Sequence, residues 1–358
     1  MNEPPESICI LRLSAIGDVC HTVPVVRTLK ACLPETRITW IVGKVEAELV
    51  ADLPGVEFLV LDKGAGWGGL RALRAQLAGR RFDVLLHMQA ALRASIASFA
   101  VEAPRRIGFD RARARDGQWL FTNERIAARE RQHVMDGLFG FAEALGITER
   151  HLVWDLPVPD DARACAEEYL PQPGRVLAIS PCASHESRDW RPERYAAVAD
   201  YVRERFGLDV VLTGGPSARE RAMAEAIRAA MKSVPVDLVG RTSLKELLAV
   251  FGRCAALVAP DSGPVHVGSA AGIPVIGLYA VSNPERTGPY LSRHLTVNRY
   301  PENAERYFGR PAAEARWGAR LWLKHGMDTI TVTDVEDRLD AVMACSSIAT
   351  GSGPEGGG

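Results

Sequence analysis

The chain has 358 residues, which is longer than one hydrophobic core usually supports and predicts two domains. Its 47% hydrophobic and 24% charged residues are typical of a soluble globular protein and exclude a disordered or fibrous chain. A formal net charge of −1 produces no overall attraction to nucleic acid, so we expect no nucleic-acid partner.

The cysteines and the apolar segments indicate a cellular compartment. Seven cysteines are scattered without a C-x-x-C pair, which fits free thiols in a reducing compartment better than disulfides or zinc. The apolar run after the opening M-N-E-P-P-E-S is too short for a secretory signal peptide, and no run reaches the about 20 apolar residues of a membrane span. We therefore expect a cytoplasmic protein.

Short apolar runs alternate with amphipathic stretches, as in proteins built from strand–helix–strand units with mainly parallel sheets. The predicted strands are Ile8–Leu13, Ile38–Val42, Val84–His87, Val176–Ser180, Val210–Thr213, Ala256–Ala259 and Val275–Tyr279. The predicted helices are Val23–Leu33, Glu193–Phe206, Ala218–Met231, Leu244–Phe251 and Val265–Ala271. Two S/T-x-x-E capping boxes, Ser243–Glu246 and Thr333–Glu336, predict where two helices start.

The alternation is interrupted between Leu156 and Arg175, where four prolines surround one short helical segment. We expect domains at 1–160 and 175–346, a linker at 161–174 and a disordered tail at 347–358, whose glycine-rich sequence cannot bury apolar surface. Ligands of open α/β sheets bind beyond the carboxyl ends of the strands, so two doubly wound halves would face a shared cleft.

The first candidate site residue is Asp18, in L-S-A-I-G-D, where the first predicted strand has ended and the next helix follows. Gly17 before it predicts a sharp backbone turn. The pattern leaves two roles open for Asp18. It can cap the helix, since Asp is among the best N-cap residues, or it can be a catalytic carboxylate at the rim of the cleft.

The second candidate site is the turn Asp261-Ser262-Gly263, which lies between a predicted strand and a helix. The free N–H groups and partial positive charge of such a helix start favour a diphosphate, and His266 could add a donor. Asp261 is expected to hold sugar hydroxyls or the first N–H groups. Purely structural roles remain open for both side chains.

Two more loops are expected at the same edge of the second sheet. Ser184, Ser187 and Arg188 follow one strand and are suited to phosphate oxygens. T-G-G-P follows the next strand, with Glu220 soon after, but this is not the G-x-G-x-x-G of a dinucleotide site. The chain has no D-x-D pair and no His/Cys cluster with metal-ligand spacing, so we expect a phosphate site that works without a metal.

Three separated motifs resemble, in the same order, the ADP-heptose:lipopolysaccharide heptosyltransferases, which form glycosyltransferase family nine. They are S-A-I-G-D with H-T-V-P near the start, R-x-W-x-P from Arg188 to Pro192, and D-S-G-P-V-H from Asp261 to His266. The resemblance runs from about Ile8 to Tyr290. The stretches 88–93, 108–113 and 136–138 are similar to the branch that adds the first heptose to the Kdo–lipid A core.

This resemblance implies a GT-B fold, with the acceptor on the N-terminal Rossmann-like domain and the nucleotide sugar on the C-terminal one. It also implies an inverting, metal-independent transfer of heptose from ADP-heptose to Kdo, without another cofactor, in which Asp18 is the general base. The donor-binding candidates are Ser184, Ser187, Arg188, Glu220, Thr242, Asp261, Ser262, Gly263 and His266. In one departure, Arg188 stands where the family commonly has lysine, and one extra residue separates Trp190 from Pro192.

The acceptor side is predicted from charge. Residues 93–133 contain nine arginines and no lysine against five acidic residues, which suits bidentate binding of Kdo carboxylates and lipid A phosphates. An ordinary solvated surface with ion pairs is the alternative. The acceptor-binding candidates are Arg93, Arg105, Arg106, Arg111, Arg113 and Arg115.

A second basic and aromatic stretch, 300–325, is expected to be a helix packed across the domain junction with buried tryptophans. Contact with an anionic membrane is its alternative, because the implied acceptor is a lipid; we expect a peripheral protein at the cytoplasmic face of the inner membrane. The rival functions are a transferase for another nucleotide sugar or acceptor, a nucleotide-sugar epimerase and a non-catalytic glycolipid-binding protein. The missing G-x-G-x-x-G disfavours an NAD-dependent dehydrogenase.

Overall fold

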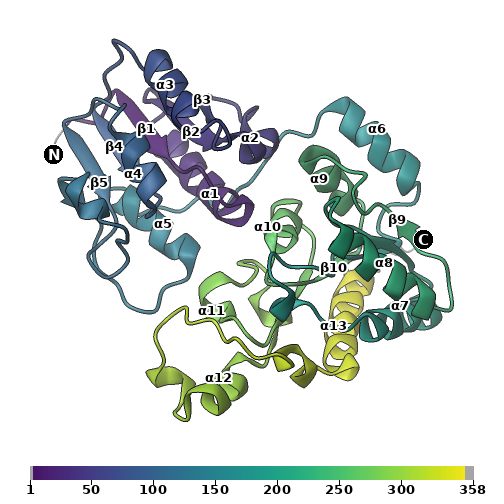
Figure 1. The fold of residues 1–358 in the computed structure, drawn as a ribbon. Helices are drawn as coiled ribbons and strands as arrows, with labels where there is room; N and C mark the ends of the chain where they lie inside the picture. Colours follow the sequence, from purple (N-terminus) through teal and green to yellow (C-terminus); the bar gives the residue numbers. More distant parts are fainter. Residues whose placement is uncertain (1–2, 351–358) are drawn as a thin grey trace, which may run out of the picture. The chain divides into compact units, whose positions relative to one another are not determined.

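The computed structural model describes residues 3–350, with side chains as far as Cys345. These residues form two parallel sheets of six strands each, with helices between the strands (Figure 1). The chain divides after Pro157 into two compact units, unit 1 and unit 2, with one sheet in each. The predicted α/β class with two doubly wound halves is confirmed.

Unit 1 has the strand order β3-β2-β1-β4-β5-β6. Successive strands are added on one side of β1 as far as β3 and on its other side from β4 onward, so the direction of addition reverses between β1 and β4. Its strands are β1 Ser7–Leu11, β2 Arg37–Gly43, β3 Val56–Leu61, β4 Val84–His87, β5 Arg105–Gly108 and β6 Glu124–Arg125. Its α-helices are α1 Ile16–Cys32, α2 Lys44–Val50, α3 Trp67–Gln76, α4 Leu92–Ser98 and α5 Val134–Glu143, and α1 packs on α5 (Figure 1). The crevice beside such a reversal is where doubly wound sheets bind ligands.

Unit 2 has the order β12-β11-β10-β7-β8-β9, with its reversal between β10 and β7. Its strands are β7 Val176–Ile179, β8 Asp209–Leu212, β9 Val236–Asp237, β10 Ala256–Pro260, β11 Val275–Tyr279 and β12 Val297–Asn298. Its α-helices are α6 Asp160–Tyr169, α7 Pro192–Phe206, α8 Ala218–Ala230, α9 Leu244–Gly252, α10 Gly263–Ala270, α11 Pro284–Thr287, α12 Tyr300–Phe308 and α13 Val332–Thr350. Helix α7 packs on α8 and on α13, and α9 packs on α6 and on α10.

Helix α1 begins seven residues before the predicted start at Val23, because Pro24 lies inside the helix and not in its first turn. Proline has no N–H to donate to the carbonyl four residues earlier, which here belongs to Cys20. The indole Nε1 of Trp154 donates to that carbonyl at 2.9 Å, so the helix continues through the proline. Gly17 and Asp18 therefore lie in the first turn of α1, and the predicted sharp turn at Gly17 is wrong.

One predicted capping box is confirmed and one is misplaced. Ser243 and Glu246 exchange reciprocal hydrogen bonds at the start of α9, from the Ser243 N–H at 2.6 Å and the Glu246 N–H at 3.2 Å. At α13 the box is formed by Thr331 and Asp334, two residues before the predicted pair. The hydroxyl and carboxylate at 331 and 334 bond the backbone first, so the helix starts there.

The predicted linker contains the expected short helix, whereas the start of the predicted disordered tail is helical. Within 161–174, α6 packs on α9, and Arg253 holds its end by donating from Nε to the Leu170 carbonyl at 2.7 Å. Helix α13 extends to Thr350, so 347–350 are helical, and the rest of the predicted tail, 351–358, lies outside the described residues.

The stretch 300–325 lies wholly in unit 2 and includes α12 and a loop. Trp322 in this loop is 59% exposed and meets the His185 ring edge-on, so the expectation of buried tryptophans is wrong at this position. None of the helices in the described part of the chain is both long enough and apolar enough to cross a membrane.

Candidate active site

Asp18 lies in the first turn of α1, just beyond the carboxyl end of β1. Its Oδ2 atom is paired with the Arg12 guanidinium and accepts the Ala15 N–H at 3.4 Å. Asp18 therefore supports the helix start from its third position, and the N-cap residue is Ala15. Its Oδ1 atom accepts no hydrogen bond from any described residue, and the side chain is 34% exposed, so this oxygen can take a proton from a ligand.

The loops after β1 and β4 are joined at the sheet reversal. Arg12, with a side chain only 9% exposed, donates to the Met88 carbonyl as well as to Asp18. Gln89 accepts the Leu13 N–H at 2.6 Å and donates to the Ser14 hydroxyl at 3.1 Å. The position of Asp18 is thus set by two strands and not by its own loop alone.

The histidines near this site are buried. His21, one turn after Asp18, packs edge-on against His133 with ring centroids 5.2 Å apart. Burial lowers the pKa of His87, at the end of β4, to about 4. The His87 imidazole is therefore neutral near pH 7, and the side-chain amide of Gln118 donates to the His87 carbonyl at 2.8 Å. The Asp18 carboxylate is therefore a more accessible proton acceptor than these buried imidazoles.

In unit 2 the loops after β7 and β10 meet through Arg188. Its Nη1 donates to the Asp261 carbonyl at 2.6 Å and to the Asp261 carboxylate at 3.1 Å, and its Nη2 donates to the Ser184 hydroxyl at 2.5 Å. The Arg188 and Asp261 side chains are only 9% and 10% exposed. Three predicted site residues are thus brought together at the sheet reversal, where a ligand is expected.

Helix α10 begins at Gly263 beside this pair, with Ser262 as its N-cap. The Ser262 hydroxyl donates to the carbonyl that ends β10 at 3.0 Å, so it does not cap the helix N–H groups. His266 lies buried in the first turn. A Cβ atom at Gly268 would stand 2.7 Å from the Leu257 side chain, so the glycine lets α10 lie close to the sheet.

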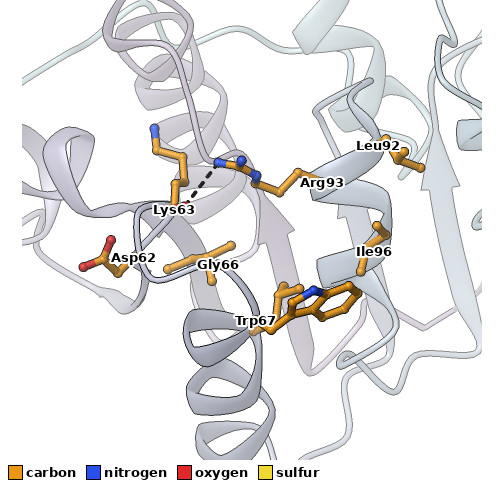
Figure 2. Close-up of a pocket in the computed structure, with 9 residues that line it drawn as sticks. Asp62, Lys63, Gly66, Trp67, Leu92, Arg93 and Ile96 are labelled. Carbon is orange, nitrogen blue, oxygen red and sulfur yellow. Dashed lines mark hydrogen bonds between the residues drawn. The ribbon is translucent and has the colours of Figure 1, made fainter.

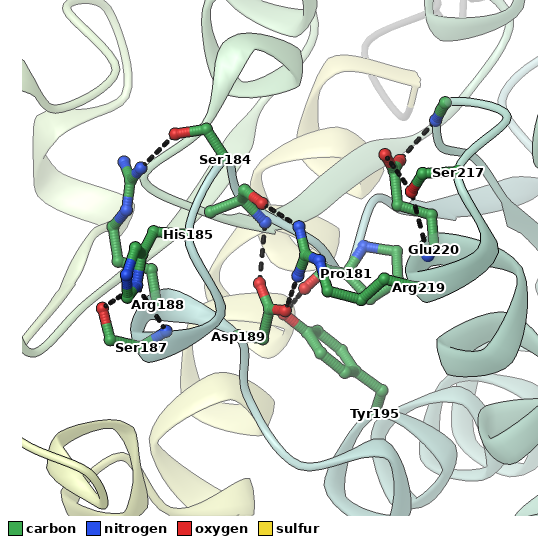
Figure 3. A network of polar contacts seen from close by, with 12 residues as sticks. Pro181, Ser184, His185, Ser187, Arg188, Asp189, Tyr195, Ser217, Arg219 and Glu220 are labelled. Carbon is green, nitrogen blue, oxygen red and sulfur yellow. Dashed lines mark hydrogen bonds and ion pairs between the residues drawn. The ribbon is translucent and has the colours of Figure 1, made fainter.

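Three further contacts fix the loop after β7 (Figure 3). Arg219 from α8 pairs with the buried Asp189 carboxylate and also donates to the Ala183 carbonyl, while the Ala183 N–H donates to Asp189 at 2.8 Å. Burial raises the pKa of Asp189. Ser187 does not join Arg188; its N–H donates to the His185 ring at 3.2 Å.

Glu220 binds the loop after β8, and Figure 3 shows it beside Ser217. Its carboxylate accepts the Gly215 N–H and the Ser217 hydroxyl, the latter at 3.1 Å, and a Cβ atom at Gly214 would stand 2.8 Å from it. Thr242, just before the N-cap of α9, is half-buried, and the described residues offer it no hydrogen bond. Neither residue contacts the Arg188–Asp261 pair.

Two of the six candidate acceptor arginines form ion pairs inside unit 1. Arg105 holds Glu124 through two hydrogen bonds of 2.8 and 2.9 Å between β5 and β6. Arg113 pairs with Asp110 and donates to Gln132 at 2.8 Å. The charges of Arg105 and Arg113 are therefore already balanced by carboxylates of this chain.

A third, Arg106, is committed to the backbone. Its guanidinium donates to the carbonyls of Phe121, Val101 and Ser98 at 2.8, 2.7 and 2.8 Å. This arrangement ties the end of α4 to the segment before β6. These contacts give Arg106 a structural role and leave few of its N–H donors for a ligand.

The remaining three, Arg93, Arg111 and Arg115, are exposed and have no carboxylate partner among the described residues. Arg93 makes one long hydrogen bond, 3.4 Å, to the Lys63 carbonyl. It also lines a cavity of about 280 Å³ between α3 and α4 (Figure 2). The three arginines are available to an anionic ligand.

We expect Arg106→Ala to lower the free energy of unfolding by about 2–4 kcal/mol, because three partly buried carbonyls lose a charged donor. Arg111→Ala, a matched exposed site, should change it by less than about 0.5 kcal/mol. Urea unfolding of both variants measures the difference. Equal stabilities would contradict the structural role of Arg106.

Sequence patterns alone missed several site residues. Arg12 and Gln89 were not candidates, although a cationic residue directly after an apolar strand run was a usable signal for Arg12. Asp189 lies inside the R-x-W-x-P motif but was not a candidate. No sequence pattern indicates its pairing with Arg219, because that contact depends on how α8 packs.

Among the described residues, Cys32, Glu149 and His151 are the one group of possible metal ligands whose atoms lie within 4.8 Å of one another. Cys32 ends α1. Since a helix rises 1.5 Å per residue, Cys32 is roughly 20 Å from Asp18. The group is separate from the candidate site.

Comparison with known proteins assigns the family. The sequence model of glycosyltransferase family 9 (heptosyltransferase) matches residues 70–317. The chain is 41% identical to the lipopolysaccharide core heptosyltransferase OpsX of Haemophilus influenzae over 333 residues, covering 93% of this chain and 96% of that protein.

Solved structures agree on the fold. A family 9 glycosyltransferase of Veillonella parvula has a TM-score of 0.78 at 22% identity, covering 95% of this chain and 97% of that one. Escherichia coli heptosyltransferase WaaC, solved with ADP, has a TM-score of 0.72 at 17% identity, covering 94% and 99%. The predicted GT-B fold is confirmed. The chain therefore belongs to glycosyltransferase family 9, the heptosyltransferases, and is an enzyme.

Proposed function

We propose that this enzyme transfers heptose from ADP-heptose to the Kdo of a lipopolysaccharide inner core, with inversion and without a metal. The observation that carries the proposal is the occurrence of an arginine–aspartate pair at the reversal of each sheet, Arg12–Asp18 and Arg188–Asp261. The relatives support the substrates: one is a lipopolysaccharide core heptosyltransferase and another was solved with ADP.

The reaction needs a proton acceptor and a site that stabilises the leaving group. Asp18 Oδ1 takes the proton from a Kdo hydroxyl as its oxygen forms a bond to the anomeric carbon. The bond from that carbon to the diphosphate oxygen breaks on the opposite face, and its electron pair leaves with ADP. General base catalysis of this kind contributes about 10²–10⁴-fold.

The leaving ADP gains negative charge, which the donor site can offset without a metal ion. The start of α10 presents a partial positive charge, and the Nε of Arg188 has no partner among the described residues. Ser184 and His266 add hydrogen-bond donors. We assign Asp261 and Gly263 to the heptose and phosphate, Glu220 and Thr242 to the nucleoside, and Arg93, Arg111 and Arg115 to the acceptor anions.

The test is product analysis by mass spectrometry with ADP-heptose and a panel of truncated lipopolysaccharide acceptors. We expect one heptosyl addition to acceptors that end in Kdo, together with release of ADP. ADP-heptose alone is the control, because an epimerase would convert a nucleotide sugar without an acceptor. Transfer from a different nucleotide sugar, or to acceptors without Kdo only, would overturn the proposed substrates.

A further inference from the structure

Helix α4 buries small polar residues and exposes large apolar ones. Leu92, Ile96 and Phe99 follow a spacing of four and three residues, so they share one side of the helix and its C-cap. Leu92 is 53% exposed and Phe99 is 73% exposed, whereas Ser95 and Ser98 are fully buried. This is the reverse of the pattern expected for a helix that faces water.

The exposed apolar side continues onto the neighbouring segments. Trp67, the first residue of α3, is 77% exposed, and Figure 2 shows its indole beside Ile96 at the cavity between the two helices. Beyond α4, the Phe99 ring packs on Phe121 with centroids 4.8 Å apart, and Leu120 next to it is 76% exposed. A contiguous exposed apolar surface of this kind usually marks an interaction site.

The same surface carries positive charge. Arg71 and Arg74 lie one and two turns after Trp67 on α3, are exposed, and have no carboxylate partner among the described residues. Arg93 on α4 is likewise without one. No acidic residue occurs within α3 or α4. Aromatic residues beside unpaired arginines are typical of surfaces that lie in the headgroup region of anionic membranes.

We propose that this surface, the α3–α4 face, docks the enzyme on an anionic lipid bilayer. The α3–α4 face consists of Trp67, Arg71, Arg74, Leu92, Ile96, Phe99 and Leu120. Its apolar side chains enter the headgroup–acyl boundary while Arg71 and Arg74 contact lipid phosphates. The inference deepens the proposed function, on which it rests for the acceptor being a lipid, by assigning membrane contact to unit 1 and not to the stretch 300–325.

Charge favours a bilayer over a second copy of the chain. A symmetric dimer through the α3–α4 face would bring Arg71 and Arg74 of both copies, four unpaired cations, into one interface. Like charges placed together across an interface are unfavourable, whereas a bilayer containing anionic lipid neutralises them. The face is therefore complementary to a lipid surface and not to itself.

The test is co-sedimentation of the full chain with vesicles of phosphatidylcholine, with and without phosphatidylglycerol, and with no acceptor present. We expect binding to the anionic vesicles that weakens as salt is raised. Trp67→Ser with Phe99→Ser should weaken it by at least about tenfold, because two aromatic anchors are lost. Arg71→Gln with Arg74→Gln should also weaken it about tenfold or more, at roughly fivefold per arginine.

The matched control is Tyr307→Ser with Trp322→Ser, two exposed aromatics of unit 2 that should leave vesicle binding unchanged. Loss of binding in this control alone would overturn the proposal in favour of the stretch 300–325. Unchanged binding of both α3–α4 variants, or a chain that dimerises through the face and ignores the vesicles in light scattering, would also overturn it. Because the vesicles contain no acceptor, failure of heptosyl transfer leaves this result standing.

Discussion

Asp18→Asn is expected to reduce kcat by about 10²–10⁴-fold, the usual contribution of a general base, and to leave ADP binding unchanged. Asparagine keeps an oxygen for the Ala15 N–H, so the start of α1 should persist. It cannot take up a proton at the position of Oδ1, the oxygen without a donor in the described structure. Steady-state kinetics and calorimetric titration with ADP measure the two effects separately.

The pH profile gives a second readout for Asp18. A general base has to be unprotonated to accept a proton, so activity of the unchanged enzyme should fall when the medium is made acidic. This acidic limb should disappear in the residual activity of Asp18→Asn. If Asp18→Asn turns over at nearly the normal rate, its role is that of a helix-supporting residue only.

Arg12→Lys is the matched control for this site. Arg12 contacts Asp18 and the Met88 carbonyl together, and a lysine ammonium group lacks the fork that reaches both. We expect a smaller loss of kcat than for Asp18→Asn, with the acidic limb retained, because the base remains and only its placement changes. A loss as large as that of Asp18→Asn, without the limb, would contradict the assignment of Asp18 as the base that acts independently of Arg12.

The central strands could be predicted from the sequence because a buried parallel strand needs a continuous apolar run. Val84–His87 and Val275–Tyr279 were predicted with the residues that the structure has. The edge strands β6, β9 and β12 have two residues each, which is too short for any periodicity to appear. The start of α1 was missed because its proline is compensated by Trp154, which is 130 residues further along the chain.

The candidate site was predictable in its location and less so in its contacts. Arg188 and Asp261 each follow a central strand of a parallel sheet, so the sequence placed them at one edge although they are 73 positions apart. That they pair with each other depends on rotamers and burial, which no local pattern records. Counting arginines likewise could not distinguish Arg106, bound to backbone carbonyls, from the exposed Arg111.

Arg188→Ala is expected to weaken ADP binding by at least about tenfold, since a hydrogen bond to a charged group contributes about 1.5–3 kcal/mol. The same change leaves the Asp261 carboxylate buried without its partner, which costs on the order of 3–5 kcal/mol of stability. A loss of binding in this variant alone therefore has two explanations. Urea unfolding and calorimetric titration with ADP have to be measured together.

The double variant Arg188→Ala with Asp261→Ala separates these explanations. Removing both charges of a buried pair restores most of the stability that the loss of one partner costs. ADP affinity should remain at least about tenfold weaker, because the arginine that we assign to the diphosphate is still missing. The titration uses ADP without its sugar, so a contact of Asp261 with the heptose does not enter. A double variant that binds ADP as tightly as the unchanged enzyme would make Arg188 a structural partner of Asp261, and the charge of the leaving group would then have to be stabilised by α10 and its neighbours alone.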